Sequence, residues 1–321
     1  MMEIYSRQEK VLGDIKKLRN EKIAVVGAGS IGSFLSEFLV RSGFNDIKII
    51  DRDFVEIENL SCQNFFQEDI NLPKALVLAK RLKKIDEAAR IKHEIIDLNY
   101  KNIEILKESS IIFDCTDNMI TRFLINDYCV KNKKVWFYAA AMGKVGYSFA
   151  IFPDEACLRC FIKKPVITET CETAGLMSNL PPMLSSIQVS RAINYVLHGI
   201  KDNNFLTIDA STRQIRKFYV KKNKNCECCV KRNFEFLKGK ENQMSILCGN
   251  NSFQIKVDEK IDFEELARLE KIGFVNMNDY IFHFRKNKTS ISIFKDGRII
   301  VKGVKSEEEA KKVIAKYLGF S

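Results

Sequence analysis

Short apolar runs alternate with amphipathic stretches over the first 120 residues of the chain. This alternation predicts a mostly parallel β-sheet whose strands are joined by crossover helices. The expected strands lie at residues 22–27, 47–51 and 110–114, and the expected helices at 31–42, 74–85 and 121–131. The pattern then favours two buried strands joined by a turn within 135–152 and a helix at 182–198. The sequence therefore predicts an α/β fold, a Rossmann-like sheet with helices on both faces.

A stretch rich in Gly, Asn, Lys and Ser at residues 239–251 interrupts this pattern and predicts a domain boundary. We expect a larger domain at residues 1–238 and a small α+β domain at residues 239–321. In the small domain the pattern predicts helices at 263–271 and 306–318, strands at 280–284 and 290–294, and a hairpin over 294–301. Asp296-Gly297 suits a type I′ turn in that hairpin. Ser306 and Glu309 have the spacing of an N-terminal capping box.

The composition excludes several classes of protein. With 46% hydrophobic residues and only 5 Pro and 15 Gly in 321 residues, the chain is neither disordered nor collagen-like. The stretch nearest to a membrane span, residues 135–152, is interrupted by Gly143, Lys144 and Gly146. Charged residues follow the first methionines too soon for a secretory signal. We therefore expect a cytoplasmic protein without a membrane partner.

The chain is basic, with 52 Lys and Arg against 41 Asp and Glu and a formal charge of +11. Such an excess attracts acidic partners, and nucleic acid is one of them. The lysines are scattered, however, and no nucleic-acid-binding motif accompanies them. A solvated, lysine-rich surface is the simpler interpretation, so we expect no direct contact with nucleic acid.

A glycine-rich turn is the first motif that carries chemistry. Gly27, Gly29 and Gly32 stand between an expected strand and an expected helix, and Asp51 ends the following strand. The glycines allow a tight turn and close approach of phosphate, the helix N-terminus attracts the anion, and the acid binds ribose hydroxyls. Taken alone, this motif indicates a nucleotide, and an NAD-dependent dehydrogenase is its commonest owner.

Ten cysteines in a long cytoplasmic chain indicate metal binding or catalysis rather than disulfides. Cys157 and Cys160 form one Cys-x-x-Cys pair, and Cys226 and Cys229 form a second. Four thiolates predict a closed, structural zinc site that ties two distant segments together. Reduced free thiols are the alternative, and Cys228 leaves the register of the second pair ambiguous. We expect Cys115, Cys129 and Cys248 to be buried or incidental thiols.

Several further blocks surround the glycine turn. They are Asp51-Arg-Asp53, the run from Asn59 through Cys62 to Gln63, Pro73-Lys74, and Asp114-Cys-Thr-Asp117-Asn118. Together, and in this order, they resemble the ThiF/MoeB/HesA family of adenylyltransferases, relatives of the ubiquitin-activating enzymes. The resemblance covers residues 4 to about 236, which makes residues 1–238 an adenylation domain. The last part of the chain resembles a C-terminal extension of some prokaryotic members.

The resemblance implies a site for ATP and Mg²⁺. The implied nucleotide-binding residues are Gly27, Gly29, Ser30, Ile31, Gly32, Asp51, Asp53, Asn59, Gln63, Lys74, Asp117 and Asn118. Phosphates would lie on the glycine turn and near Asn59 and Lys74, ribose on Asp51, and Mg²⁺ on Asp117. Arg7 matches an arginine that reaches ATP from the second subunit of a homodimer. One position departs from the family, because Cys62 stands where an arginine is usual.

Each of these positions also has a structural interpretation. Asp117 could cap the following helix, Lys74 could be a surface lysine, Asn59 could be a turn residue, and Arg7 could be a solvated helix residue. Cys171 matches a loop position at which some family members form a covalent intermediate with the carrier. No Lys or His lies beside it in sequence to lower the pKa of its thiol.

The function implied by the resemblance is adenylation of a small β-grasp sulfur carrier or ubiquitin-like protein ending in Gly-Gly. The carrier's terminal glycine carboxylate attacks the α-phosphorus of ATP and releases pyrophosphate. This nucleophile is already an anion, so it needs charge neutralisation and in-line positioning rather than a general base. The alternatives are an NAD-dependent oxidoreductase and a non-catalytic ATP-binding scaffold.

Overall fold

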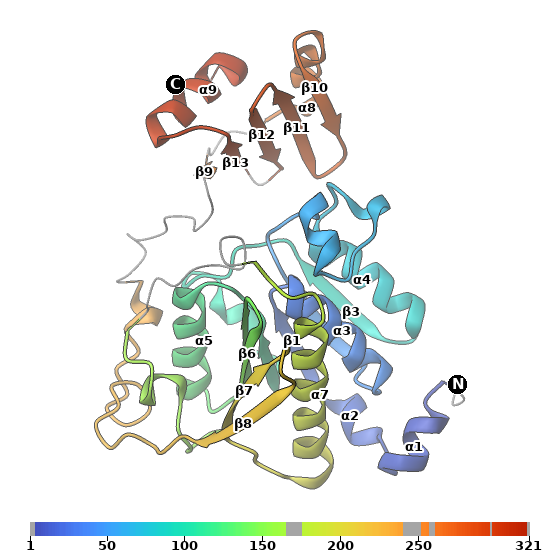
Figure 1. Ribbon diagram of the computed structural model, residues 1–321, viewed down its shortest axis with the longest axis vertical. Coiled ribbons are helices and arrows are strands. Elements are labelled where there is room, and N and C mark those ends of the chain that lie inside the picture. The colour runs from blue at the N-terminus through green and yellow to red at the C-terminus, as the bar shows by residue number, and fades with distance from the viewer. Residues whose placement is uncertain (1–3, 165–174, 240–251, 257–260, 296, 320–321) are drawn as a thin grey trace. The chain divides into compact units, whose positions relative to one another are not determined.

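The computed structural model describes residues 4–164, 175–239, 252–256, 261–295 and 297–319 (Figure 1). The chain divides into two compact units, Met1–Gln243 and Met244–Ser321. The sequence predicts the boundary after residue 238, close to this division, but residues 240–251 lie outside the described residues. Cys171 and Cys248 lie outside them as well.

The first unit is built on an eight-stranded sheet of order β3-β2-β1-β4-β5-β6-β7-β8. The strands are β1 Lys22–Val26, β2 Asp46–Ile50, β3 Arg90–Glu94, β4 Ile111–Asp114, β5 Val135–Met142, β6 Val145–Ile151, β7 Asn204–Asp209 and β8 Gln214–Tyr219. Strands β1 to β5 pair in parallel, whereas β6, β7 and β8 join the sheet antiparallel. The predicted mostly parallel sheet is confirmed.

Helices cover both faces of this sheet, as predicted (Figure 1). The helices are α1 Ser6–Leu12, α2 Lys16–Asn20, α3 Ser30–Arg41, α4 Lys74–Ile85, α5 Met119–Lys131 and α7 Leu180–His198. Short 3₁₀ segments connect them: η1 Ile57–Ser61, η2 Gln67–Asp69, η3 Ile103–Leu106, η4 Leu158–Cys160 and η5 Phe236–Lys238. Alternate strand residues such as Val25 and Phe113 pack against α3, α4 and α7. Their neighbours, such as Trp136, pack against α5 and the cysteine segments.

The second unit is a five-stranded antiparallel sheet of order β10-β11-β12-β13-β9. Its elements are β9 Ser252–Lys256, α8 Phe263–Leu266, η7 Ala267–Lys271, β10 Phe274–Met277, β11 Ile281–Lys286, β12 Thr289–Phe294, β13 Arg298–Lys302 and α9 Glu307–Leu318. One face of this sheet carries the apolar core, in which Phe282 lies against Phe263 and Phe284 against Tyr317. The predicted α+β class of this unit is confirmed.

Several predicted elements differ in detail. No strand is predicted from the sequence at the positions of β3, β7, β8, β9 and β10. In β3 and β10 most side chains are exposed, so these strands lack a run of buried apolar residues. The helix predicted at 263–271 divides into α8 and the 3₁₀ segment η7. In the predicted type I′ turn, Asp296 lies outside the described residues, while Gly297 has a φ of 82°.

The start of α9 confirms half of the predicted capping box. The Ser306 hydroxyl accepts a hydrogen bond from the Glu309 N–H at 3.2 Å. The Glu309 carboxylate, however, accepts from the Lys305 N–H at 2.7 Å and not from Ser306.

No helix in the described part of the chain has both the length and the apolar character needed to cross a membrane.

Candidate functional site

The glycine turn lies where the chain direction of the sheet changes. Strand β1 stands between β2 and β4, so the connections after β1 and β4 leave the sheet on opposite sides. In open α/β sheets a crevice at such a point binds ligands. The two connections touch here, because a Cβ added to Gly27 would lie 2.7 Å from the Cys115 carbonyl oxygen.

Two of the three glycines of the motif have a steric reason to be glycine. Gly27 has a φ of 93°, which favours glycine, and a Cβ on Gly32 would lie 1.8 Å from the Gly27 carbonyl oxygen. Around Gly29 the space is open, since a Cβ there would meet no atom within 4 Å. Gly29 is the N-cap of α3, and no side chain caps this helix end. The N–H groups of Ser30 and Ile31 therefore begin a helix dipole that favours a phosphate over Gly29.

Asp51 ties the turn to the end of β2. Its carboxylate accepts hydrogen bonds from the Ala28 N–H at 2.5 Å and from the Asp53 N–H at 2.6 Å. Burial, followed by the negative charge of Asp53, raises the pKa of Asp51 to about 6. The carboxylate thus lies beside the first turn of α3, where the sequence predicts the ribose.

Lys74 is the buried cation of the crevice. It begins α4, its N–H bonds to the Asp53 carbonyl oxygen at 2.9 Å, and the residue is 7% exposed. Burial acts to lower the pKa of Lys74, but nearby carboxylates outweigh it and raise that pKa. These carboxylates belong to Asp53, Asp51, Glu56 and Asp117. The interpretation of Lys74 as a surface lysine is therefore wrong.

Asp117 follows β4 and is exposed. The cap of α5 is Asn118, whose side-chain oxygen accepts from the Ile120 N–H at 2.8 Å and the Thr121 N–H at 3.4 Å. Asp117 is therefore not the capping residue. This cap also explains why α5 begins at Met119, two residues before the predicted start. Asn118 remains a predicted nucleotide-binding residue, although its side-chain oxygen already accepts hydrogen bonds from the helix N-terminus.

The segment after β2 holds three further predicted positions. The Asn59 side-chain oxygen accepts from the Glu56 N–H at 2.9 Å, so Asn59 does have the expected turn role. Gln63 has a buried side-chain oxygen without a hydrogen-bond partner among the described residues. Cys62, in place of the family's arginine, is half-buried. Phosphate contacts by Asn59 and Gln63 remain predictions.

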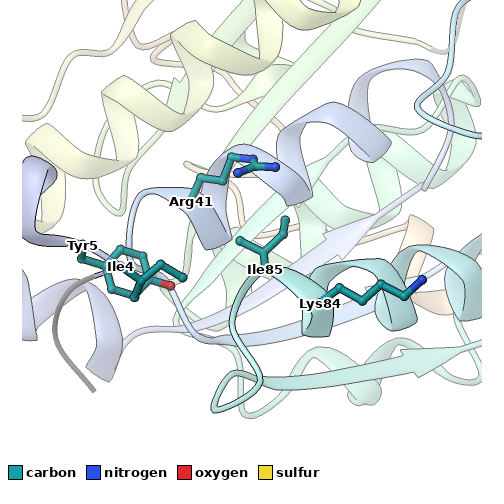
Figure 2. A pocket seen from close by; sticks show the side chains of 5 residues that line it. All are labelled: Ile4, Tyr5, Arg41, Lys84 and Ile85. Carbon is teal, nitrogen blue, oxygen red and sulfur yellow. The ribbon is translucent and has the colours of Figure 1, made fainter.

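Arg7 lies far from the glycine turn of its own chain. It is an exposed residue of α1, just after Tyr5, whose hydroxyl donates to the Val40 carbonyl oxygen at 3.0 Å. Val40 lies near the C-terminal end of α3, about 15 Å along the axis from Ser30. Figure 2 shows Tyr5 in a pocket beside Arg41 and the end of α4. Arg7 is thus placed at the wrong end of α3 to reach this crevice.

The four predicted zinc ligands come together. The sulfur atoms of Cys157, Cys160, Cys226 and Cys229 all lie within 4.8 Å of one another. Tetrahedral zinc with bonds of about 2.3 Å would separate its sulfur ligands by about 3.8 Å, so the cluster fits that ion. Cys228 is not among these four residues, and its sulfur instead accepts a hydrogen bond from the Asn126 side chain at 3.2 Å. The second pair in the cluster is therefore Cys226 with Cys229, which resolves its register.

Sequence reasoning misses two groups. Arg52 lies at the crevice in an ion pair with Asp97 at 3.0 Å, and only its position next to Asp51 signalled a role. Buried Arg159, which stands between Cys157 and Cys160 in the sequence, pairs with buried Asp127 at 3.3 Å. No sequence motif indicates this pair. The predicted thiols Cys115 and Cys129 are both buried, as expected.

A glycine turn, a helix N-terminus and an acid at the end of the next strand, arranged around a switch point, define a nucleotide-binding protein of the Rossmann-like class. Within this class the chain belongs to the ThiF family, whose pattern matches residues 5–230. Residues 246–320 match a second family, described as transcription factor TFIID (or TATA-binding protein).

Two relatives carry informative names. The chain is 32% identical over 343 aligned positions to the sulfur carrier protein ThiS adenylyltransferase of Bacillus subtilis, covering 98% of this chain and 99% of that protein. It is 31% identical over 229 positions to the sulfur carrier protein adenylyltransferase of Thermus thermophilus, covering 67% and 84%. The crystal structure of E. coli MccB with ATP shares the fold, with a TM-score of 0.62, 20% identity and coverage of 70% and 74%.

We predict that the cysteine cluster stabilises the fold by holding one zinc ion per chain. Cys226→Ala should lose the metal and lower the melting temperature by several degrees, because metal binding to the folded state alone stabilises it. Cys228→Ala is the matched control and should keep the metal. Metal analysis and thermal unfolding of protein prepared without added metal measure both. A metal-free wild type that melts at the same temperature with and without zinc would contradict the prediction.

The pKa of Asp51, about 6, predicts opposite effects of pH on ATP binding and on stability. Below pH 6 the acid is protonated and its hydrogen bonds from the ribose hydroxyls lose their charge assistance, so ATP affinity should fall by up to about tenfold per pH unit. The folded-state pKa is above the unfolded value of 3.8. Asp51 therefore stabilises the fold fully below pH 3.8, and this contribution is lost as pH rises through 6.

ATP binding is titrated between pH 5 and 8, and thermal unfolding from below pH 3.8 to above pH 6, because the stability effect of Asp51 develops between these two pKa values. Asp51→Asn is the control, since it removes the titrating group while keeping the shape of the side chain. The variant should show neither dependence beyond the titration of ATP itself. Equal pH profiles for the variant and the wild type would remove Asp51 from the ribose site.

Proposed function

We propose that the protein is an ATP-dependent adenylyltransferase that activates the C-terminal glycine of a small sulfur-carrier or ubiquitin-like protein. The observation that carries this proposal is the buried Lys74 ammonium, which faces the carboxylates of the crevice beside an uncapped helix N-terminus. Names of relatives that cover nearly the whole chain support it. Family membership favours neither the NAD-dependent oxidoreductase nor the non-catalytic scaffold.

The residues of the crevice supply what the reaction requires. The N–H groups at the start of α3 hold phosphate oxygens over Gly29, and Asp51 holds the ribose. Lys74 offsets negative charge as the carrier carboxylate attacks the α-phosphorus and the bond to pyrophosphate breaks. Asp117, exposed and not used as a cap, would hold Mg²⁺, which supplies further positive charge to the leaving pyrophosphate. No proton transfer is needed.

The carrier needs a docking surface as well as a nucleotide. Edge strand β8 offers one, because all six of its residues are exposed. Ile215, Phe218 and Tyr219 on this strand are at least 50% exposed. An open, partly apolar edge strand is suited to pairing with the sheet of a β-grasp protein. We assign β8 to carrier binding in a cytoplasmic enzyme.

Zinc at the four cysteines would be structural. The set offers four thiolates and hence no open coordination position for substrate. Cys171, outside the described residues, belongs to the step after adenylation. Either the adenylate passes directly to a sulfur donor, or Cys171 accepts the carrier as a thioester and expels AMP. We favour direct transfer.

We predict that Asp117→Ala abolishes carrier-dependent exchange of pyrophosphate into ATP. Loss of a metal-binding carboxylate should lower the rate at least a hundredfold and leave the melting temperature unchanged, since Asn118 caps α5. Glu68→Gln, a change at an exposed acid outside the crevice, is the control. The assay uses the ThiS carrier of Bacillus subtilis with ATP and labelled pyrophosphate. Exchange by the variant within threefold of wild type would remove Asp117 from the mechanism.

The position of Arg7 predicts that each site of a homodimer uses Arg7 of the partner. Arg7→Ala and Asp117→Ala should each be inactive alone. When the two variants are mixed and refolded or co-expressed, one site of each heterodimer regains both groups, which restores about a quarter of wild-type exchange. A mixture as inactive as its components, with heterodimers shown by mass spectrometry, would place Arg7 outside the site.

A further inference from the structure

An ion pair lies at the carboxyl ends of β2 and β3, next to Asp51. Arg52 directly follows Asp51 after β2, and its guanidinium lies 3.0 Å from the carboxylate of Asp97, which follows β3. Because β2 and β3 are neighbours in the sheet, this pair bridges the carboxyl ends of the two strands. No role in the function proposed above uses either residue.

The ion pair is held in place from both sides. Arg52 also contacts the Asp53 carboxylate at 3.6 Å, and its side chain is only 26% exposed. On the other side, the Asp97 carbonyl oxygen accepts from the side-chain amides of Asn99 at 2.9 Å and Asn102 at 2.8 Å. The guanidinium is therefore fixed before any ligand binds. Burial acts to lower the pKa of Arg52, but the surrounding carboxylates outweigh burial and raise this pKa above its usual value. The guanidinium therefore stays charged.

The order of the strands indicates which part of ATP meets this pair. Phosphate belongs at the N-terminus of α3, directly after β1, and ribose at Asp51 after β2. A nucleotide that extends in this direction places its base over the ends of β2 and β3. Arg52 and Asp97 directly follow these two strands.

The chemistry of the pair suits a purine base. A guanidinium is planar and weakly hydrated, and it stacks on aromatic faces when its plane is fixed. We infer that Arg52 is the adenine-contacting residue of the site and that its guanidinium stacks on the base, with Asp97 as the positioning residue. This inference rests on the proposed function only in that it takes ATP as the ligand.

Direct binding of ATP to the full chain, without a carrier, tests the inference. Stacking on a base is worth roughly tenfold or more in affinity. Arg52→Ala should therefore weaken ATP binding at least tenfold, while inorganic tripolyphosphate competes equally well against the variant and the wild type. Arg52→Phe, which restores a flat stacking surface, should recover most of the affinity, and Arg52→Lys should not.

The matched control is Arg90→Ala. Arg90 pairs with Asp46 at 3.1 Å across the same two strands, but at their amino ends. This variant should bind ATP like wild type. Recovery by Arg52→Lys but not by Arg52→Phe would assign Arg52 to the phosphates, and unchanged affinity in Arg52→Ala would exclude any contact; both results overturn the inference. Failure of the wild type to bind ATP would instead refute the proposed function itself.

Discussion

A contact between main-chain atoms at the ends of β1 and β4 determines how the nucleotide crevice is built. The Gly27 backbone lies against the Cys115 carbonyl, and Gly32 lies against the Gly27 carbonyl, with no room for a methyl group at either glycine. Main-chain atoms cannot swing aside as a flexible side chain does, so glycine is the residue that fits. Because of this contact, α3 begins directly at the crevice and the Asp51 carboxylate can reach the Ala28 N–H.

The close packing of the crevice also concentrates charge. Carboxylates outnumber the cations Lys74 and Arg52 there, so the site is net negative before ATP, itself an anion, arrives. Cations additional to Lys74 and Arg52 would therefore favour binding of ATP. In the proposed mechanism Mg²⁺ on Asp117 would provide one such cation, and Arg7 of a partner subunit would provide another. This balance explains why a chain with only 3 histidines suits the chemistry: the reaction needs positive charge and position rather than a base.

The sequence predicts those features that depend on local pattern. Buried strands such as β1 and β4 are apolar runs in the sequence, and the cysteine pairs have the spacing of metal ligands. Both features can therefore be predicted from the sequence alone. The sequence does not predict features that depend on tertiary neighbours. Strand β3 is exposed along most of its length, and the pairs Arg52 with Asp97 and Arg159 with Asp127 join residues far apart in sequence. The choice of Asn118 over Asp117 as the cap depends on backbone geometry that adjacent capping residues leave open.

Helix α5 links the cysteine cluster to the crevice. Its middle contacts the cluster segments, because the Asn126 side chain accepts from the Leu158 N–H at 2.9 Å and donates to the Cys228 sulfur. Its N-terminal cap, Asn118, lies about 12 Å away along the helix and directly follows Asp117. A closed metal site performs no chemistry, but it fixes the two segments against which α5 packs. Zinc at the cluster would therefore act on the proposed reaction through the helix, by limiting where Asp117 can lie relative to the glycine turn.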